Sequence, residues 1–148
     1  MTKRRLFLLK AAGILSSLLF LPISAIASVW NKMAFESVSI DDAFKGLQVS
    51  KNVLSNEIQI IAPEKAENGA VVQVEIRSNL ANTQEIAILV EKNPTPLIAN
   101  FSFANGIDPY VVTRIKMAET SDILALVKAD NQYFLARKSV EVLENGCG

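Results

Sequence analysis

Residues 71–78 read Val-Val-Gln-Val-Glu-Ile-Arg-Ser. Val72, Val74 and Ile76 alternate with polar residues, which is the two-residue period of a β-strand with one buried and one solvated face. Six other apolar stretches are separated by turn-forming residues: Ile58–Ile61, Ile86–Glu91, Leu97–Phe103, Tyr110–Met117, Ile123–Ala129 and Gln132–Leu143. Seven short strands at this spacing predict a mainly β protein, with an immunoglobulin-like β-sandwich over residues 57–143.

A short helical segment is expected in front of the sandwich, over residues 28–56. Ser39 and Asp42 have the spacing of a capping box. The apolar residues that follow fall on one face of a helix: Ile40, Ala43, Phe44 and Leu47. We expect this face to lie against the sandwich or against a partner. Trp30 and Phe35 precede the helix and are expected to dock into the protein's own core in preference to a partner.

Residues 1–27 have the features of an export signal. Lys3, Arg4 and Arg5 precede an apolar run from Ala11 to Leu21, which is short for a membrane span, and residues 25–27 form a small-x-small cleavage site. Residues 4–8, Arg-Arg-Leu-Phe-Leu, resemble the twin-arginine export motif. The mature protein, from about residue 28, is expected in the periplasm with no membrane segment after cleavage.

Composition excludes several classes of function. The chain of 148 residues contains no histidine and one cysteine. Ser-His-Asp and Cys-His catalysis, histidine metal sites and cysteine cages for zinc or iron are therefore excluded. Beyond residue 27 the chain has 11 basic and 15 acidic residues, a net charge of −4, which argues against binding to nucleic acid. We expect neither catalytic residues nor a metal site in this chain.

The single cysteine, Cys147, lies in the C-terminal stretch 144–148, which reads Glu-Asn-Gly-Cys-Gly. Its neighbours Asn145, Gly146 and Gly148 predict a slender, flexible arm that presents the thiol. From Val142, five residues earlier, the thiol can reach up to roughly 17 Å. Two negative charges, on Glu144 and the terminal carboxylate, disfavour the reactive thiolate, so we expect a partner to activate it.

Three functions of this thiol remain open from the residues alone. Cys147 can carry a covalently bound group between enzymes, or it can form a disulfide with another chain as part of a structural or adhesive module. A thiol oxidoreductase or peroxide sensor is disfavoured, because neither a resolving cysteine nor a basic neighbour accompanies Cys147.

The C-terminal arm resembles that of the SoxY family, the sulfur carriers of the periplasmic Sox system that oxidises thiosulfate. Members of that family end in Gly-Gly-Cys-Gly, and here Asn145 replaces the first glycine, although asparagine tolerates left-handed backbone conformations. The likeness extends through four segments of the predicted sandwich, namely Ala62–Glu64, Ala66–Val72, Glu91–Leu97 and Thr113–Met117.

The resemblance implies a protein that is not an enzyme and has no cofactor. Cys147 would carry sulfur intermediates, as an S-thiosulfonate and a persulfide, while other Sox proteins act on them. The implied partners are a SoxZ-like sandwich subunit, a c-type cytochrome that conjugates thiosulfate, a hydrolase that releases sulfate and, where one is present, a sulfur dehydrogenase.

Overall fold

The computed structural model describes residues 31–144. The predicted export signal, Trp30 and residues 145–148, which include Cys147, lie outside the described residues. Within the described part, no helix has the length and apolar character that crossing a membrane requires.

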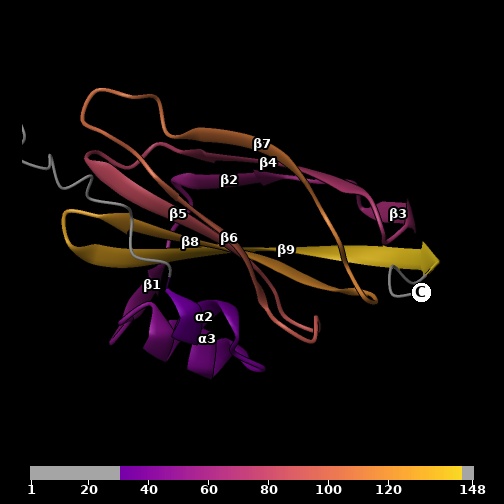
Figure 1. Cartoon of the computed structure of the whole chain (residues 1–148). Coiled ribbons are helices and arrows are strands. Elements are labelled where there is room, and N and C mark those ends of the chain that lie inside the picture. The colour runs from indigo at the N-terminus through magenta and orange to yellow at the C-terminus, as the bar shows by residue number, and fades with distance from the viewer. Residues whose placement is uncertain (1–30, 145–148) are drawn as a thin grey trace, which may run out of the picture. The chain divides into compact units, whose positions relative to one another are not determined.

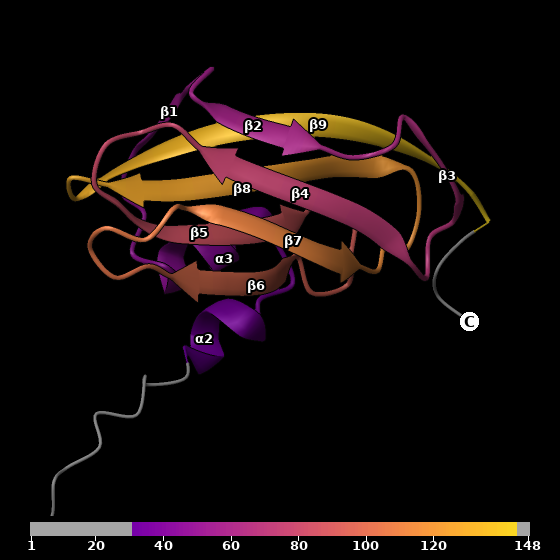
Figure 2. The same ribbon diagram turned by 90° about the horizontal axis from the view of Figure 1, so that it is seen from above.

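Two β-sheets face each other in two layers (Figures 1 and 2). The larger sheet consists of β1 (Asn52–Leu54), β3 (Lys65–Asn68), β5 (Thr83–Val90), β6 (Leu97–Ser102), β8 (Ser121–Ala129) and β9 (Gln132–Glu144). Its strand order is β1-β9-β8-β5-β6, and β3 also pairs with β9. The smaller sheet consists of β2 (Ile58–Ile61), β4 (Val72–Ser78) and β7 (Tyr110–Ile115), in the order β2-β4-β7.

The sandwich core lies between the two sheets and follows from the alternation in the strands. Val72, Val74 and Ile76 of β4 are at most 1% exposed and pack against Ile86 and Ile88 of β5 within one apolar cluster. Each buried side chain of this size stabilises the fold by about 1.5–3 kcal/mol. The predicted sandwich is therefore confirmed.

Two short helices cover the other face of the larger sheet (Figure 1). They are α2 (Lys32–Phe35) and α3 (Ile40–Gly46), and the Ser39 hydroxyl caps α3 by accepting from the Asp42 amide at 3.1 Å. The apolar face of α3 packs against the sheet together with Phe35, in a cluster that includes Ala87, Leu89, Leu124 and Leu126. Of the two expected positions for this face, the sandwich is the one observed, so the face is not free for a partner.

The number of strands differs from the prediction. All seven expected strands are present, but β1 and β3 are additional, so the described residues form nine. Both additions are three or four residues long and pair in parallel with β9, while β2 between them belongs to the other sheet. β1 also lies inside the segment 28–56 that was expected to be helical. Strands this short show no recognisable period, and unlike Ile58–Ile61 these two lack an apolar run that would mark them.

The contact between the two helices depends on Gly46. A Cβ atom at this position would lie 2.6 Å from the Cα of Ala34, which is fully buried, and the Gly46 carbonyl accepts from Asn31 Nδ2 at 2.7 Å.

We expect Gly46→Ala to lower the free energy of unfolding by about 1–2 kcal/mol, because the overlap with the α2 backbone outweighs the gain in helix propensity. Chemical denaturation measures this change. Lys45→Ala, at the exposed neighbouring position, is the control and should change stability by less than about 0.5 kcal/mol. Equal stability of Gly46→Ala and the native protein would show that the helices do not need this close approach.

Candidate functional site

The last residues of β9 are held by β3 and the turn that follows it (Figure 2). Asn68 is the register partner of Glu144, and the Gly69 amide donates to the Glu144 carbonyl at 2.8 Å. The sequence predicted that the arm starts at Glu144, but this residue belongs to β9. The difference arises because β3, which could not be recognised in advance, supplies backbone partners up to this position.

Further hydrogen bonds hold Asn68 and Gly69 in place. The Asn68 side chain accepts from the Ala70 amide at 2.7 Å, as in an Asx turn, and the Met117 amide donates to the Gly69 carbonyl at 2.7 Å. Met117 is fully buried in the sandwich core. The residue that precedes the arm is thus connected to the core through two hydrogen bonds and one turn.

The loop between β7 and β8 provides a second support. The Val142 amide donates to the Thr120 hydroxyl at 2.9 Å. Asn93 braces the same loop, because its side chain donates to the Lys116 carbonyl and accepts from the Ala118 amide, each at 2.8 Å. β9 is therefore fixed on both sides close to its end.

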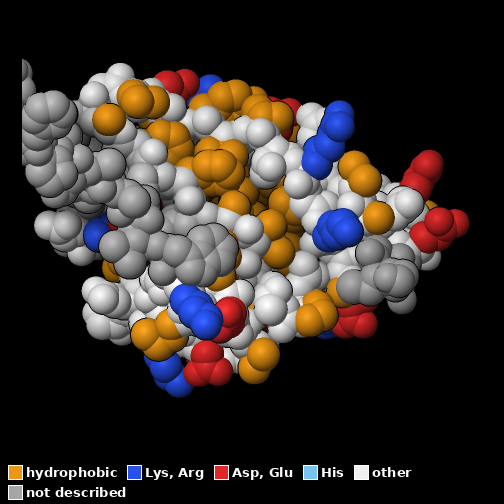
Figure 3. All heavy atoms as spheres, in the orientation of Figure 1, with side chains coloured by type: hydrophobic (Ala, Val, Ile, Leu, Met, Phe, Trp, Pro, Cys, Tyr) orange, Lys and Arg blue, Asp and Glu red, His pale blue; other side chains and the backbone are white. Residues whose placement is uncertain are grey.

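Negative charge predominates where β9 ends. Figure 3 shows acidic side chains at the right-hand end of the molecule, where β3 and the tip of β9 lie in Figure 1. Glu64, Glu67 and Glu144 are exposed, and none takes part in an ion pair within residues 31–144. Glu141 pairs with Lys65 at 3.0 Å.

The groups whose pKa values are perturbed lie on other elements. The hydrogen bond from the Tyr110 hydroxyl to the Glu75 carboxylate raises the pKa of Tyr110. Arg77 lies 4.4 Å from the Tyr110 ring centre and pairs with Asp108 at 2.9 Å, so these residues form an exposed polar network on the smaller sheet. The lowered pKa of Asp42 has a local cause, its hydrogen bonds from Lys45 and Ser39. Arg114 and Lys116 are exposed, so their charges lie on the solvated face of the smaller sheet and the loop after it.

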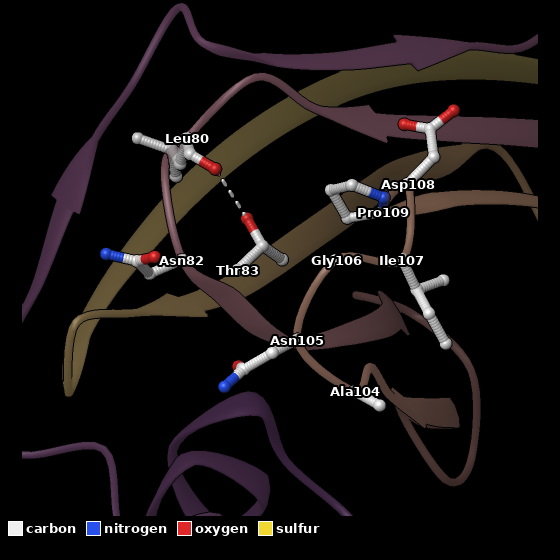
Figure 4. Close-up of a pocket in the computed structure, with 9 residues that line it drawn as sticks. All are labelled: Leu80, Asn82, Thr83, Ala104, Asn105, Gly106, Ile107, Asp108 and Pro109. Carbon is white, nitrogen blue, oxygen red and sulfur yellow. Dashed lines mark hydrogen bonds between the residues drawn. The ribbon is translucent and has the colours of Figure 1, made fainter.

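An open depression of about 440 Å³ lies at the opposite end of the sandwich. Residues 104–109, between β6 and β7, line it together with Leu80, Asn82 and Thr83, whose hydroxyl donates to the Leu80 carbonyl at 3.0 Å (Figure 4). Thr83 pairs with Ala129, next to the start of β9, whereas the arm follows the end of this 13-residue strand. That separates the two sites by about 40 Å at ~3.3 Å per residue.

The depression offers little chemistry. Among the described residues that line it, Asp108 alone is charged, and it is paired with Arg77. Within residues 31–144, no three side chains of the metal-binding types come together in a way that could hold a metal ion.

The predicted functional residues Cys147, Asn145, Gly146 and Gly148 lie outside the described residues, and the structure places only the point from which they extend. Sequence reasoning missed the residues that hold this point, namely Asn68, Gly69, Asn93 and Thr120. Asn-Gly is a common turn dipeptide, but the partner Glu144 is 76 residues away from Asn68 in the chain, and no local pattern reveals such a pairing.

A family model described as sulfur oxidation protein SoxY matches residues 44–147, which include every strand of the sandwich and Cys147. The chain belongs to the SoxY family. Among solved structures, the sulfur carrier protein SoxY from Chlorobium limicola f thiosulfatophilum is 32% identical with a TM-score of 0.66, over 76% of this chain and 99% of that one. No protein of curated function matched the sequence.

A second solved structure has a similar fold. The superoxide reductase (neelaredoxin) from Ignicoccus hospitalis is 20% identical with a TM-score of 0.51, over 59% of this chain and 80% of that one. This likeness is one of fold alone.

The Thr120 hydroxyl should be needed to keep the end of β9 of this SoxY-family protein paired. Thr120→Val keeps the shape of the side chain but leaves the Val142 amide without its acceptor, so we expect about 1 kcal/mol of local destabilisation. Native-state hydrogen exchange should show amides 142–144 exchanging several-fold faster. Thr95→Val, in an exposed loop, is the control. Unchanged exchange in Thr120→Val would mean that β3 alone holds the strand.

Proposed function

We propose that this SoxY-family protein is a covalent sulfur carrier, that its cargo is bound to the Cys147 thiol, and that it catalyses no step itself. The observation that carries the proposal is the family match, which extends to residue 147 and includes the only cysteine. The similar structure from Chlorobium is that of a sulfur carrier protein. A chain without histidine is poorly equipped for acid–base catalysis at neutral pH.

The proposed loading step is an oxidation. The Cys147 thiol and thiosulfate combine to a cysteine S-thiosulfonate, one S–S bond forms, and two electrons and one proton are released. The c-type cytochrome that the family resemblance implies would accept these two electrons, one in each haem reduction. Because nearby carboxylates disfavour the thiolate, the partner rather than this chain has to remove the thiol proton.

The following step is a hydrolysis. Water adds to the terminal sulfonate sulfur, the S–S bond to that sulfur breaks, and sulfate and a proton leave while a persulfide stays on Cys147. A sulfur dehydrogenase, where one is present, oxidises this sulfur on the same arm, and further hydrolysis regenerates the thiol. In this scheme the carrier is the substrate of each enzyme.

The proposed setting is the periplasm, reached by twin-arginine export of residues 1–27. A SoxZ-like sandwich subunit is the proposed permanent partner. The periplasm is an oxidising compartment, in which a free thiol is oxidised or forms disulfides. A Cys147 sulfur that already carries a covalently bound group is protected from this reaction.

The proposed division of the chain is an export signal over residues 1–27, the helical segment and the sandwich, followed by a thiol-bearing arm that starts at residue 145. The structure supports the later start of the arm, because Glu144 is paired. Asn145, Gly146 and Gly148 are proposed to give the arm its flexibility.

Cys147→Ser should abolish loading while leaving the fold intact. Intact-mass analysis after incubation with thiosulfate and the conjugating cytochrome should show a reductant-sensitive addition on the native protein and none on the variant. A matched control moves the thiol to the exposed middle of β9, in the double variant Ser139→Cys/Cys147→Ser, which should also remain unloaded because loading requires the arm.

A stable disulfide between two native chains, with no sulfur adduct after the same incubation, would contradict the carrier function. That result would favour the structural or adhesive module instead.

A further inference from the structure

The paired end of β9 limits how far the thiol can reach. If Cys147 is the carrier thiol, as proposed above, it lies only three positions after Glu144. Glu144 is still paired with Asn68 in the sheet, and its carbonyl accepts from the Gly69 amide. At ~3.3–3.6 Å per residue, the Cα of Cys147 lies at most about 11 Å from that of Glu144. The reach of roughly 17 Å expected from the sequence was counted from Val142, because the pairing that continues to Glu144 leaves no local signal.

An enzyme that acts on a thiol with this short reach has to approach the body of the carrier. Its reacting atoms must come within about 11 Å of Glu144, plus the length of the cysteine side chain. The enzyme surface around its active-site entrance therefore covers the residues that surround the base of the arm. We define the arm-base surface as Glu67, Asn68, Val71, Leu143 and Glu144.

These five residues are neighbours in the structure. Asn68 pairs with Glu144, and the Val71 amide donates to the Asn68 carbonyl at 3.4 Å. Glu67 and Leu143 each precede one member of the Asn68–Glu144 pair in parallel strands, so they occupy neighbouring positions. The hydrogen bonds to Met117 and Thr120 described above hold this surface on the sandwich core.

The arm-base surface combines apolar and acidic side chains. Leu143 is 57% exposed and Val71 is 61% exposed, although neighbouring Val142 and Val72 are buried. Glu67 and Glu144 are exposed and have no ion-pair partner within residues 31–144. A partner that covers this surface has to offer apolar contacts and positive charge.

We propose that the arm-base surface is the docking site for the enzymes that process Cys147, and that each of them presents an apolar patch flanked by Lys or Arg at its active-site entrance. Two observations select this occupant: the short chain between Glu144 and the thiol, and the unpaired negative charge at its base. The face of the larger sheet beside α3 does not compete, because the helices cover it.

The charge contribution can be tested with Glu67→Gln/Glu144→Gln, which keeps the backbone hydrogen bonds. The matched control is Glu57→Gln/Asp130→Asn, which removes two exposed charges near the other end of the sandwich. Loading of Cys147 is followed with thiosulfate and the conjugating cytochrome of the same organism, by intact mass against time.

For Glu67→Gln/Glu144→Gln we expect kcat/KM to fall about fivefold at ~0.01 M ionic strength, with kcat unchanged, because rim charges act mainly on association. The difference should vanish near ~1 M salt, where the screening length is about 3 Å. The control should match the native protein. Alkylation by iodoacetamide, a small neutral reagent, should be no slower in Glu67→Gln/Glu144→Gln than in the native protein, because removing the Glu144 charge favours the thiolate.

The apolar contribution is tested with Leu143→Ser, with Leu54→Ser as its control at another exposed leucine. Leu143→Ser should lower kcat/KM by about threefold at every salt concentration, since this contact is not electrostatic.

Native loading rates in both Glu67→Gln/Glu144→Gln and Leu143→Ser would overturn the docking site, and so would faster loading when the two charges are removed. Those results would leave the carrier function intact. A native protein that is never loaded on Cys147 would instead overturn the proposed function itself.

Discussion

The pairing of β9 is the constraint on which the rest of the structure depends. β9 runs along β8 from Gln132 to Val140, and on its other edge it accepts β1 near its start and β3 at its end. Its side chains contribute to both apolar clusters, Val140 to the sandwich core and Leu135 to the core beneath the helices. β9 therefore connects both apolar clusters to the base of the arm.

Much of the fold could be predicted from the sequence, because each strand of the sandwich carries its own alternation or apolar run. Ile58–Ile61 was predicted with the observed bounds, and Ser39 caps α3 as its spacing indicated. The position of the helices was left open. The apolar runs Ile86–Val90 and Ile123–Val127 carried an unused signal, since a strand with no polar face is buried on both sides.

Part of the candidate site could likewise be predicted from the sequence, and part could not. Cys147 and its small neighbours could be recognised because a lone thiol between glycines is a local feature of the sequence. The anchor could not, because it depends on Asn68 meeting Glu144 and on Thr120 meeting Val142, pairs that are distant in the chain. Side-chain hydrogen bonds of this kind leave no period or motif.

The short strand β3 has a consequence for how two copies of the protein can meet. It occupies the edge of β9 next to the arm, and its own outer edge is only four residues long and carries Lys65, a poor template for adding another strand. Pairing of two molecules edge to edge along the end of β9, an arrangement that would hold their thiols side by side in an unproductive dimer, is therefore disfavoured.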